Sequence, residues 1–395
     1  MCGIVASLET PLEKPLEDIL SRGIRHTHVN GIIHRRLPIR DLSRDYDQPI
    51  VYRGWTISFV GEFFNIGTTH ELQYVAQNLI GQDGGIAPSV FHELQQDGFW
   101  AVVAQNPAKD ELHLIADYLA QKPLYYREDI ASCASEITPL KHYFPVTPDN
   151  IYLSATKKWG YSPETHRTPW NEIKRVLPGE YVILRPNRPP LKRIVDPLFQ
   201  RALPANSLKQ AIITATHLRA EESDVSVSLL LSTGLDSNII GSILPNARRV
   251  SAPEYFEAPK SEYDFQEPIN LGSLDTQNYL ADQVDTTVVI TGDGADELFG
   301  GYRRTLEYDS QGSDIFHELV GFHLSKLDRV HANRLQEVRT PFLARDVVQA
   351  ALALPYDLRK NKRILRELWP EFKDLLKIPM KPNGFSPTDY ARNYK

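Results

Sequence analysis

Residues 288–303 have the sequence Val-Val-Ile-Thr-Gly-Asp-Gly-Ala-Asp-Glu-Leu-Phe-Gly-Gly-Tyr-Arg. The β-branched run at its start predicts a short strand that is buried on both faces of a sheet. The glycine-rich turn after it lets a ligand come close to the backbone, and oxygen ligands such as its carboxylates are those that Mg²⁺ prefers. The stretch therefore predicts the end of a buried strand at which a nucleotide and a metal ion could bind.

A second segment repeats this arrangement about sixty residues earlier. Residues 225–231 form an apolar run with small serines, and Ser-Thr-Gly-Leu-Asp-Ser follows at 232–237 before a predicted helix at 238–244. Backbone N–H groups, a helix N-terminus and serine hydroxyls together favour a phosphate-binding loop. The chain has no G-x-x-x-x-G-K-[ST] motif, so this is not a kinase-type P-loop. An ordinary strand-to-helix turn capped by serines is the alternative.

Strand, glycine turn and helix alternate through the second half, which predicts a parallel α/β sheet. The first half is β-rich and is separated from the second by a proline-rich stretch at 185–204, so we expect two domains, 1–195 and 205–395. The other predicted elements are strands at 51–60, 99–104, 112–116, 181–184 and 249–251, and helices at 72–80, 87–95, 208–220, 347–354 and 362–376.

The first residues, Met1-Cys2-Gly3, point to nucleophilic chemistry. If Met1 is removed, Cys2 carries a free α-amine, whose reference pKa of about 7.7–8.0 suits a base for the adjacent thiol. A cysteine at position two can also be accidental. Arg36, Glu62 and Asp97 follow in order, and a zwitterion such as glutamine needs an arginine for its carboxylate and an acid for its ammonium group.

The ordered motifs resemble a known family along nearly the whole chain. Residues 1–185 are similar to the glutaminase domain of class II glutamine amidotransferases, which has an α+β N-terminal-nucleophile fold. The second half resembles the synthetase domain of asparagine synthetases, an α/β N-type ATP pyrophosphatase. The chain is thus identified as a compact, divergent member of the glutamine-hydrolysing asparagine synthetase family, on segments that also include 176–181, 337–343 and 362–367.

For the first domain, the resemblance implies a thiolate of Cys2 that attacks the side-chain amide of glutamine. Arg36 would hold the substrate carboxylate, and Glu62 and Asp97 its ammonium end. The N–H of Gly61 would form part of the oxyanion hole. Family members usually carry an asparagine before this glycine, where the present chain has Val60. Loss of one such donor typically costs about 10²–10³ in rate.

For the second domain, the resemblance implies binding of ATP with Mg²⁺. Asp236 and Asp296 are the predicted metal ligands, Asp293 is expected near the proton transfer from attacking ammonia, and Lys362 is expected to stabilise charge on pyrophosphate. The predicted nucleotide-binding residues are Leu230, Ser232, Gly234, Asp236, Ser237, Val250 and Gly292.

Four departures from the family pattern lie in this domain. Thr233 replaces a usual glycine of the loop, and Ala344 replaces the aspartate that ends the segment at 341–344. The stretch between Ser237 and Thr291 is shorter than in the family, and Leu271 lies near the position of an expected aspartate. In the family, the residues of this longer stretch line the nucleotide and the acceptor carboxylate, whereas Thr233 adds bulk near the phosphates.

Composition agrees with a globular protein. The chain has 395 residues, 42% apolar and 24% charged, with a net charge of −6, which gives no general attraction to nucleic acid or anionic membranes. Two cysteines provide no disulfide framework, and a signal peptide and long apolar runs are lacking. We expect a cytoplasmic protein whose partners are small molecules; a homodimer stays open.

These observations predict a glutamine-dependent asparagine synthetase. It would hydrolyse glutamine at Cys2, channel ammonia, and amidate aspartate through an acyl-adenylate, with release of AMP and pyrophosphate. Two alternatives stay open. One is an amidotransferase or cyclase acting on a different carboxylate, and the other is a catalytically dead regulatory homologue.

Overall fold

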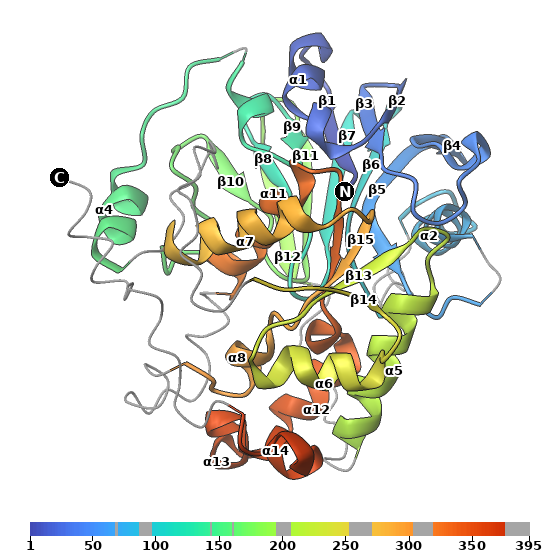
Figure 1. Cartoon of the computed structure of the whole chain (residues 1–395). Helices are drawn as coiled ribbons and strands as arrows, with labels where there is room; N and C mark the ends of the chain where they lie inside the picture. Colours follow the sequence, from blue (N-terminus) through green and yellow to red (C-terminus); the bar gives the residue numbers. More distant parts are fainter. Residues whose placement is uncertain are drawn as a thin grey trace. The chain divides into compact units, whose positions relative to one another are not determined.

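The computed structural model describes residues 1–67, 70–86, 97–142, 144–159, 162–194, 207–252, 271–302 and 319–375. The chain divides into two compact units (Figure 1). The first comprises Met1–Ser154 with Glu164–Leu198, and the second comprises Ala155–Pro163 with Phe199–Lys395.

The first unit contains two six-stranded sheets whose paired strands are antiparallel. One sheet has the order β10-β8-β9-β1-β3-β2 and the other the order β12-β11-β7-β6-β5-β4. The strands are β1 Gly3–Ser7, β2 Arg25–Val29, β3 Ile32–Arg36, β4 Ile50–Tyr52, β5 Trp55–Phe63, β6 Gly98–Asn106, β7 Glu111–Ala116, β8 Tyr125–Arg127, β9 Ser132–Ala134, β10 Ile173–Arg175, β11 Glu180–Arg185 and β12 Arg188–Ile194.

Three apolar clusters hold this unit together, because alternate side chains of a strand point to opposite faces. One cluster joins strands of both sheets and includes Ile4, Val60 and Leu114. A second packs α2 Glu71–Leu79 on the other face of the β5–β6–β7 region, and a third packs segments near α1 Glu13–Asp18 and η3 Thr138–Lys141 on the other face of the β1–β3 region. The result is a layered α+β sandwich. The remaining elements are η1 Leu20–Arg22 and η2 Arg44–Tyr46, and the helix α4 Asn150–Trp159 spans the boundary at Ser154.

Most predicted elements of the first unit are present, with shifted ends. The predicted strand at 51–60 is two strands, β4 and β5, because Arg53 and Gly54 have positive φ angles and form the turn of a hairpin. The predicted helix at 72–80 corresponds to α2. The predicted helix at 87–95 lies outside the described residues.

A fully buried carboxylate, Asp117, ties β6 to the segment after β7. Its side chain accepts hydrogen bonds from the backbone N–H groups of Trp100 (3.0 Å), Leu119 (2.8 Å) and Gln121 (3.0 Å). Burial raises the pKa of Asp117 to about 6, although these bonds oppose the shift. The residue therefore acts as a structural acceptor inside the sandwich.

The second unit contains a four-stranded sheet of order β14-β13-β15-β16 in which every pair is parallel. This confirms the predicted fold class, a β-rich α+β unit followed by a parallel α/β unit. Its elements are α5 Leu208–Glu221, β13 Val227–Leu230, α6 Leu235–Ile243, β14 Arg248–Val250, α7 Leu271–Gln283, β15 Val288–Ile290, α8 Ala295–Leu298, the π-turn η5 Leu319–His323, α11 Leu324–Ala332, β16 Glu337–Arg339, η6 Pro341–Leu343, α12 Arg345–Leu352, α13 Tyr356–Arg359, η7 Lys360–Lys362, α14 Arg363–Leu368 and η8 Pro370–Phe372.

The predicted helix at 362–376 is wrong at both ends of its described part. Lys362 ends the turn η7 with a left-handed backbone, so α14 starts only at Arg363. The helix stops at Leu368 because Pro370 follows, and proline disfavours a helical conformation at the residue before it. Residue 376 lies outside the described part.

No helix in the described ranges has the length and apolar character needed to cross a membrane.

Replacing Asp117 by alanine should destabilise the first unit by about 3 kcal/mol, since three buried N–H groups would lose their acceptor. Hydrogen-exchange mass spectrometry on peptides that cover 98–121 should show a loss of protection on the order of 100-fold. Glu128→Ala is the matched control, because its ion pair with Lys192 is exposed and should contribute less than about 1 kcal/mol. Equal effects of the two changes would contradict the assigned role.

Candidate active sites

Cys2 lies just before β1, which runs between β3 and β9 inside its sheet. The thiol is half-buried, packs against the cluster that contains Val60, and its Sγ accepts the N–H of Leu37 at 3.4 Å. Gly3 permits this arrangement, because a Cβ there would lie 2.6 Å from the Cβ of Arg22. The backbone donor and the packing together hold the sulfur in one place.

Met1 is completely buried in the full-length chain. The Nη1 group of Arg22 lies 3.8 Å from the Met1 sulfur, and the Nε of Arg22 forms a buried 2.5 Å ion pair with Glu136. A free α-amine on Cys2 requires removal of Met1, so its role as a base stays a prediction.

The edge of β5 that faces away from β6 is capped by side chains. Two residues before the start of β4, Gln48 accepts the N–H of Phe59 at 2.7 Å through Oε1. Four residues along, Glu71 accepts the N–H of Phe63 at 2.7 Å through Oε1. Side chains thus take the place of a neighbouring strand at two positions.

Gly61 lies midway between these capped residues. Backbone N–H groups of a strand alternate in direction, so the N–H of Gly61 points to the same edge as those of Phe59 and Phe63. Trp100, which pairs with Gly61 in β6, directs its own N–H to Asp117 on the far side, as this alternation requires. The pairing register therefore predicts that the expected oxyanion donor faces outward, between the two caps.

Only glycine fits at position 61. Its φ is +97°, and a Cβ would lie 1.8 Å from the carbonyl oxygen of Phe99. The preceding Val60 is buried among apolar side chains of the cluster on which Cys2 packs. Its side chain has no hydrogen-bond donor, so the departure from the usual asparagine is a real loss of a polar group at this position.

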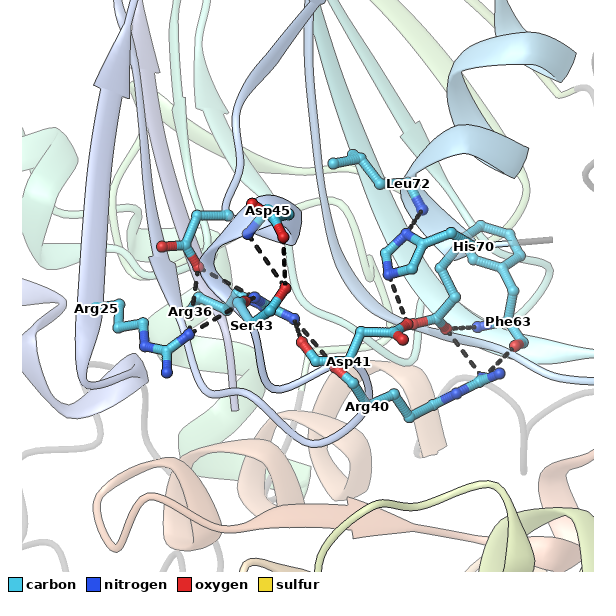
Figure 2. A network of polar contacts seen from close by, with 11 residues as sticks. Arg25, Arg36, Arg40, Asp41, Ser43, Asp45, Phe63, His70 and Leu72 are labelled. Atoms are coloured by element: carbon cyan, nitrogen blue, oxygen red, sulfur yellow. Dashed lines mark hydrogen bonds and ion pairs between the residues drawn. The ribbon is translucent and has the colours of Figure 1, made fainter. Parts of the chain in front are cut away.

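Arg36 is buried at the end of β3 and uses all four Nη hydrogens on one loop, residues 40–47 (Figure 2). Nη1 donates to the carbonyl of Ser43 (2.8 Å) and to Oδ1 of Asp47 (3.0 Å). Nη2 donates to the carbonyls of Arg40 (3.0 Å) and Asp41 (2.6 Å). The residue expected to bind the carboxylate of glutamine is thus already engaged by the chain itself.

Other side chains hold the same loop 40–47. Arg25 donates to the carbonyls of Leu42 (3.0 Å) and Ser43 (3.3 Å). Arg40 links the loop to β5 and α2 by donating to the carbonyl of Phe63 and pairing with Glu71. Figure 2 shows His70, the N-cap of α2, directed at Asp41, with Nε2 2.5 Å from Oδ2.

Glu62 lies on β5, and Asp97 immediately precedes the neighbouring strand β6. Glu62 is buried near the end of β5, and Asp97 is half-buried immediately before β6, where its carbonyl accepts the N–H of Phe64. Their proposed contact with the ammonium group of glutamine stays a prediction. The residues that sequence reasoning left without a role here are Arg25, Arg40, Asp47, Gln48 and Glu71, since their spacing follows no periodic pattern.

In the second unit, the predicted nucleotide-binding residues gather at the carboxyl ends of parallel strands. Leu230 and Val250 end β13 and β14 and are paired in register. Gly292 follows β15 by two residues, and a Cβ there would lie 3.0 Å from the Cβ of Asp236. Ligands of open parallel sheets bind at this edge.

The loop at 232–237 is closed by its own hydroxyl groups. The hydroxyl of Ser237 accepts the N–H of Ser232 at 3.0 Å, and the two hydroxyls lie 2.9 Å apart. The hydroxyl of Ser232 accepts the N–H of Gly234 at 3.0 Å. These bonds shape the turn before α6 but occupy two backbone donors, so phosphate binding by this loop stays a prediction.

Lys362 joins two acidic residues from distant parts of the sequence. Its Nζ lies 2.5 Å from Oδ2 of Asp236 and 2.5 Å from Oδ1 of Asp296. Burial disfavours the ammonium, but the two carboxylates outweigh it and raise the pKa of Lys362. Burial raises the pKa of Asp236 to about 6, against the opposing effect of Lys362. Gly301 is needed here, since a Cβ would lie 1.8 Å from Oδ1 of Asp296.

A left-handed backbone brings the lysine to this position. Asn361 and Lys362 both have φ angles of +56°, and their N–H groups donate to the carbonyls of Gly300 (3.0 Å) and Phe299 (2.8 Å). Each such residue costs roughly 1–2 kcal/mol relative to the right-handed form. This strain is typical of functional sites.

The acidic pair fits the Mg²⁺ that the family implies. Oδ1 of Asp236 is buried and has no hydrogen-bond partner within the described ranges. Mg²⁺ usually takes one or two protein carboxylates and completes its shell with phosphates and water. The described residues contain no group of three or more His, Cys, Asp or Glu side chains suited to a metal, so two carboxylates are what they offer.

A buried polar cluster lies beside this pair. Asp293 is half-buried after Gly292. Glu297 is buried in α8 and accepts the hydroxyl of Tyr302 at 2.7 Å, while Nε2 of His323 lies 3.6 Å from the same carboxylate. Burial raises the pKa of Glu297 to about 7. Glu297 and Tyr302 lie within the motif at 288–303, but their spacing in the sequence predicted no role for them.

Comparison with known proteins agrees with this organisation. A family model described as a glutamine amidotransferase domain matches residues 1–193. A model described as asparagine synthase matches residues 250–320 and 311–372. The chain therefore joins a glutamine amidotransferase domain to an asparagine synthase domain. This combination places it in the glutamine-hydrolysing asparagine synthetase family, as the motifs predicted.

The relatives are distant. Asparagine synthetase [glutamine-hydrolyzing] 1 of Bacillus subtilis is 25% identical over 71% of this chain and 53% of its own length. Asparagine synthetase [glutamine-hydrolyzing] 1 of Arabidopsis thaliana is 23% identical over 94% of this chain and 74% of its own. The chain thus spans about half of the bacterial relative. A solved glutamine phosphoribosylpyrophosphate amidotransferase from B. subtilis, complexed with ADP and GMP, is 14% identical over 74% of this chain and 69% of its own, with a TM-score of 0.30, too weak for any argument.

The contribution of His34 to the stability of the first unit should fall as the pH decreases below about 6.5. His34 is fully buried in β3, and burial together with the nearby charge of Arg36 lowers its pKa to about 3. The unfolded chain binds a proton at this residue below pH 6.5 and the folded chain does not. His34 should therefore remove about 1.4 kcal/mol of stability per pH unit between pH 6 and 4. Urea unfolding of His34→Gln should show a shallower pH dependence, and an unchanged slope would contradict this.

Replacing Lys362 by methionine should destabilise the second unit by about 3 kcal/mol, mainly because the buried Asp236 loses its counter-charge, while Asp296 is partly exposed. Asp236→Asn in the same chain should recover part of that loss. Hydrogen exchange in peptides covering 227–243 is the measurement. Lys373→Met, at an exposed position, is the control, and equal effects of the two lysine changes would refute the prediction.

Proposed function

We propose that the protein is a glutamine-dependent asparagine synthetase that moves nitrogen from glutamine to the side-chain carboxylate of aspartate. The observation that carries this proposal is the convergence of Asp236, Asp296 and Lys362 at the carboxyl edge of the parallel sheet. These residues come from three separate motifs, and the sequence predicts a role in ATP chemistry for each of them.

In the first unit, the thiolate of Cys2 attacks the side-chain amide carbon of glutamine. The N–H of Gly61 stabilises the developing oxyanion, while Arg36 binds the carboxylate and Glu62 and Asp97 bind the ammonium group. Ammonia leaves, and water hydrolyses the thioester to glutamate. Because Val60 offers no second donor, we expect this step to be slower than with an asparagine at that position.

In the second unit, the aspartate carboxylate attacks the α-phosphate of ATP, which gives an acyl-adenylate and pyrophosphate. Lys362 stabilises the negative charge on the departing pyrophosphate, and Asp236 and Asp296 would hold a Mg²⁺ that neutralises phosphate charge. Ammonia attacks the acyl carbon, Asp293 assists removal of its proton, and AMP leaves with asparagine formed.

Product analysis tests this proposal directly. The full chain with glutamine, ATP, Mg²⁺ and aspartate should form asparagine, glutamate, AMP and pyrophosphate in equal amounts. Cys2→Ala should lose the glutamine-dependent reaction but retain synthesis from ammonium salts, whereas Asp296→Asn should lose both by more than about tenfold. Intact-mass measurement would establish whether Met1 has been removed.

Each alternative has its own outcome. Pyrophosphate exchange with another carboxylic acid but not with aspartate would replace the proposed acceptor. Equal glutamate release by the wild type and Cys2→Ala, without adenylation of any acid, would indicate a catalytically dead regulatory protein.

A further inference from the structure

The Nη groups of Arg36 donate to four acceptors, and one of these acceptors is an anion. Three of its Nη bonds go to backbone carbonyls of loop 40–47, and the fourth goes to Oδ1 of Asp47. A carboxylate that binds Arg36 needs at least one charge-assisted hydrogen bond from these N–H groups. An incoming carboxylate therefore has to displace an existing acceptor of Arg36.

The three carbonyls are poor candidates for displacement. They belong to a loop that Arg25 and Arg40 also hold, through Leu42, Ser43 and Phe63. Releasing the carbonyls of Arg40 and Asp41 would leave acceptors of two half-buried residues without this donor, which costs free energy at each position. The side chain of Asp47 can rotate away without moving the backbone.

A second cation is already next to Asp47. The Nη1 of Arg25 lies 3.8 Å from the same Oδ1, and the side chain of Arg25 is 24% exposed, compared with 9% for Arg36. When Asp47 leaves Arg36, it can pair with Arg25 in a more solvated place. The exchange then replaces one carboxylate on Arg36 with another and leaves no buried charge uncompensated.

We propose that Asp47 is a built-in competitor for glutamine, whose α-carboxylate takes the place of the Asp47 carboxylate on Arg36. This inference rests on the proposed function, in which Arg36 binds that carboxylate. Binding then requires the form of the protein with Asp47 displaced, so the observed affinity is reduced by the fraction of molecules in that form. Asp47 sets the glutamine concentration at which the first unit begins to work.

Isothermal titration of L-glutamine into full-length Cys2→Ala protein tests this without turnover. Adding Asp47→Asn should tighten binding on the order of 3–10-fold, because the amide keeps an acceptor for the loop but no longer competes as an anion. Asp45→Asn is the matched control, since Asp45 is an acid of the same loop that bonds to Ser43 and not to Arg36. It should change the affinity less than twofold.

A second ligand separates competition from general electrostatics. L-Glutaminamide lacks the α-carboxylate, so its affinity should not increase in the Asp47→Asn protein. Should Asp47→Asn unfold, as judged by circular dichroism, Asp47→Ser serves the same test. Unchanged or weaker binding of glutamine by a folded variant would overturn the proposal and show that Asp47 only holds the loop.

The outcomes distinguish this inference from the proposed function. Cys2-dependent hydrolysis without tighter binding in Asp47→Asn leaves the function intact and removes the inference. Tighter binding without any hydrolysis by the wild type keeps the competitor and removes the glutaminase. If none of these proteins binds glutamine, both are wrong.

Discussion

The ammonium of Lys362 holds two carboxylates that would otherwise repel each other at the edge of the parallel sheet. Burying these charges is expensive, and only their close contact offsets the cost. Two successive left-handed residues and the absence of a side chain at Gly301 make the contact possible. The positions of Asp236 and Asp296, and hence the nucleotide site proposed between the strands, depend on this arrangement.

In the first unit, side chains satisfy backbone N–H and carbonyl groups that have no partner in a neighbouring strand. The end of β4 leaves part of the β5 edge open, and side chains of Gln48 and Glu71 cap it on either side of Gly61. Loop 40–47 presents carbonyls that Arg25 and Arg36 satisfy. In both units, polar side chains thus bind groups that regular secondary structure does not pair. The proposed chemistry takes place beside them, at Gly61 in the first unit and at Asp236 and Asp296 in the second.

The strands and the helix α2 could be predicted because burial imposes a period of 2 or 3.6 on the sequence. The strand predicted at 51–60 is two strands because Arg53 and Gly54 form a hairpin turn with positive φ angles. Arg53 is neither glycine nor asparagine, so little in the sequence indicates this turn. The helix predicted at 362–376 starts one residue late because the N–H of Lys362 donates to the carbonyl of Phe299, and it ends early because Pro370 follows. Local periodicity contains no information on such contacts.

The sequence by itself determined the family, the β-rich first half, the parallel sheet of the second half, and the residue types of both candidate sites, because ordered motifs and periodic patterns are local properties of the chain. Only the tertiary structure decided which charges meet. It placed Lys362 between Asp296 and Asp236, which precede it by 66 and 126 residues in the sequence. It also paired Arg36 with the carboxylate of Asp47. Pairing of buried charges depends on distance in space and on exclusion of water, and neither can be read from spacing along the chain.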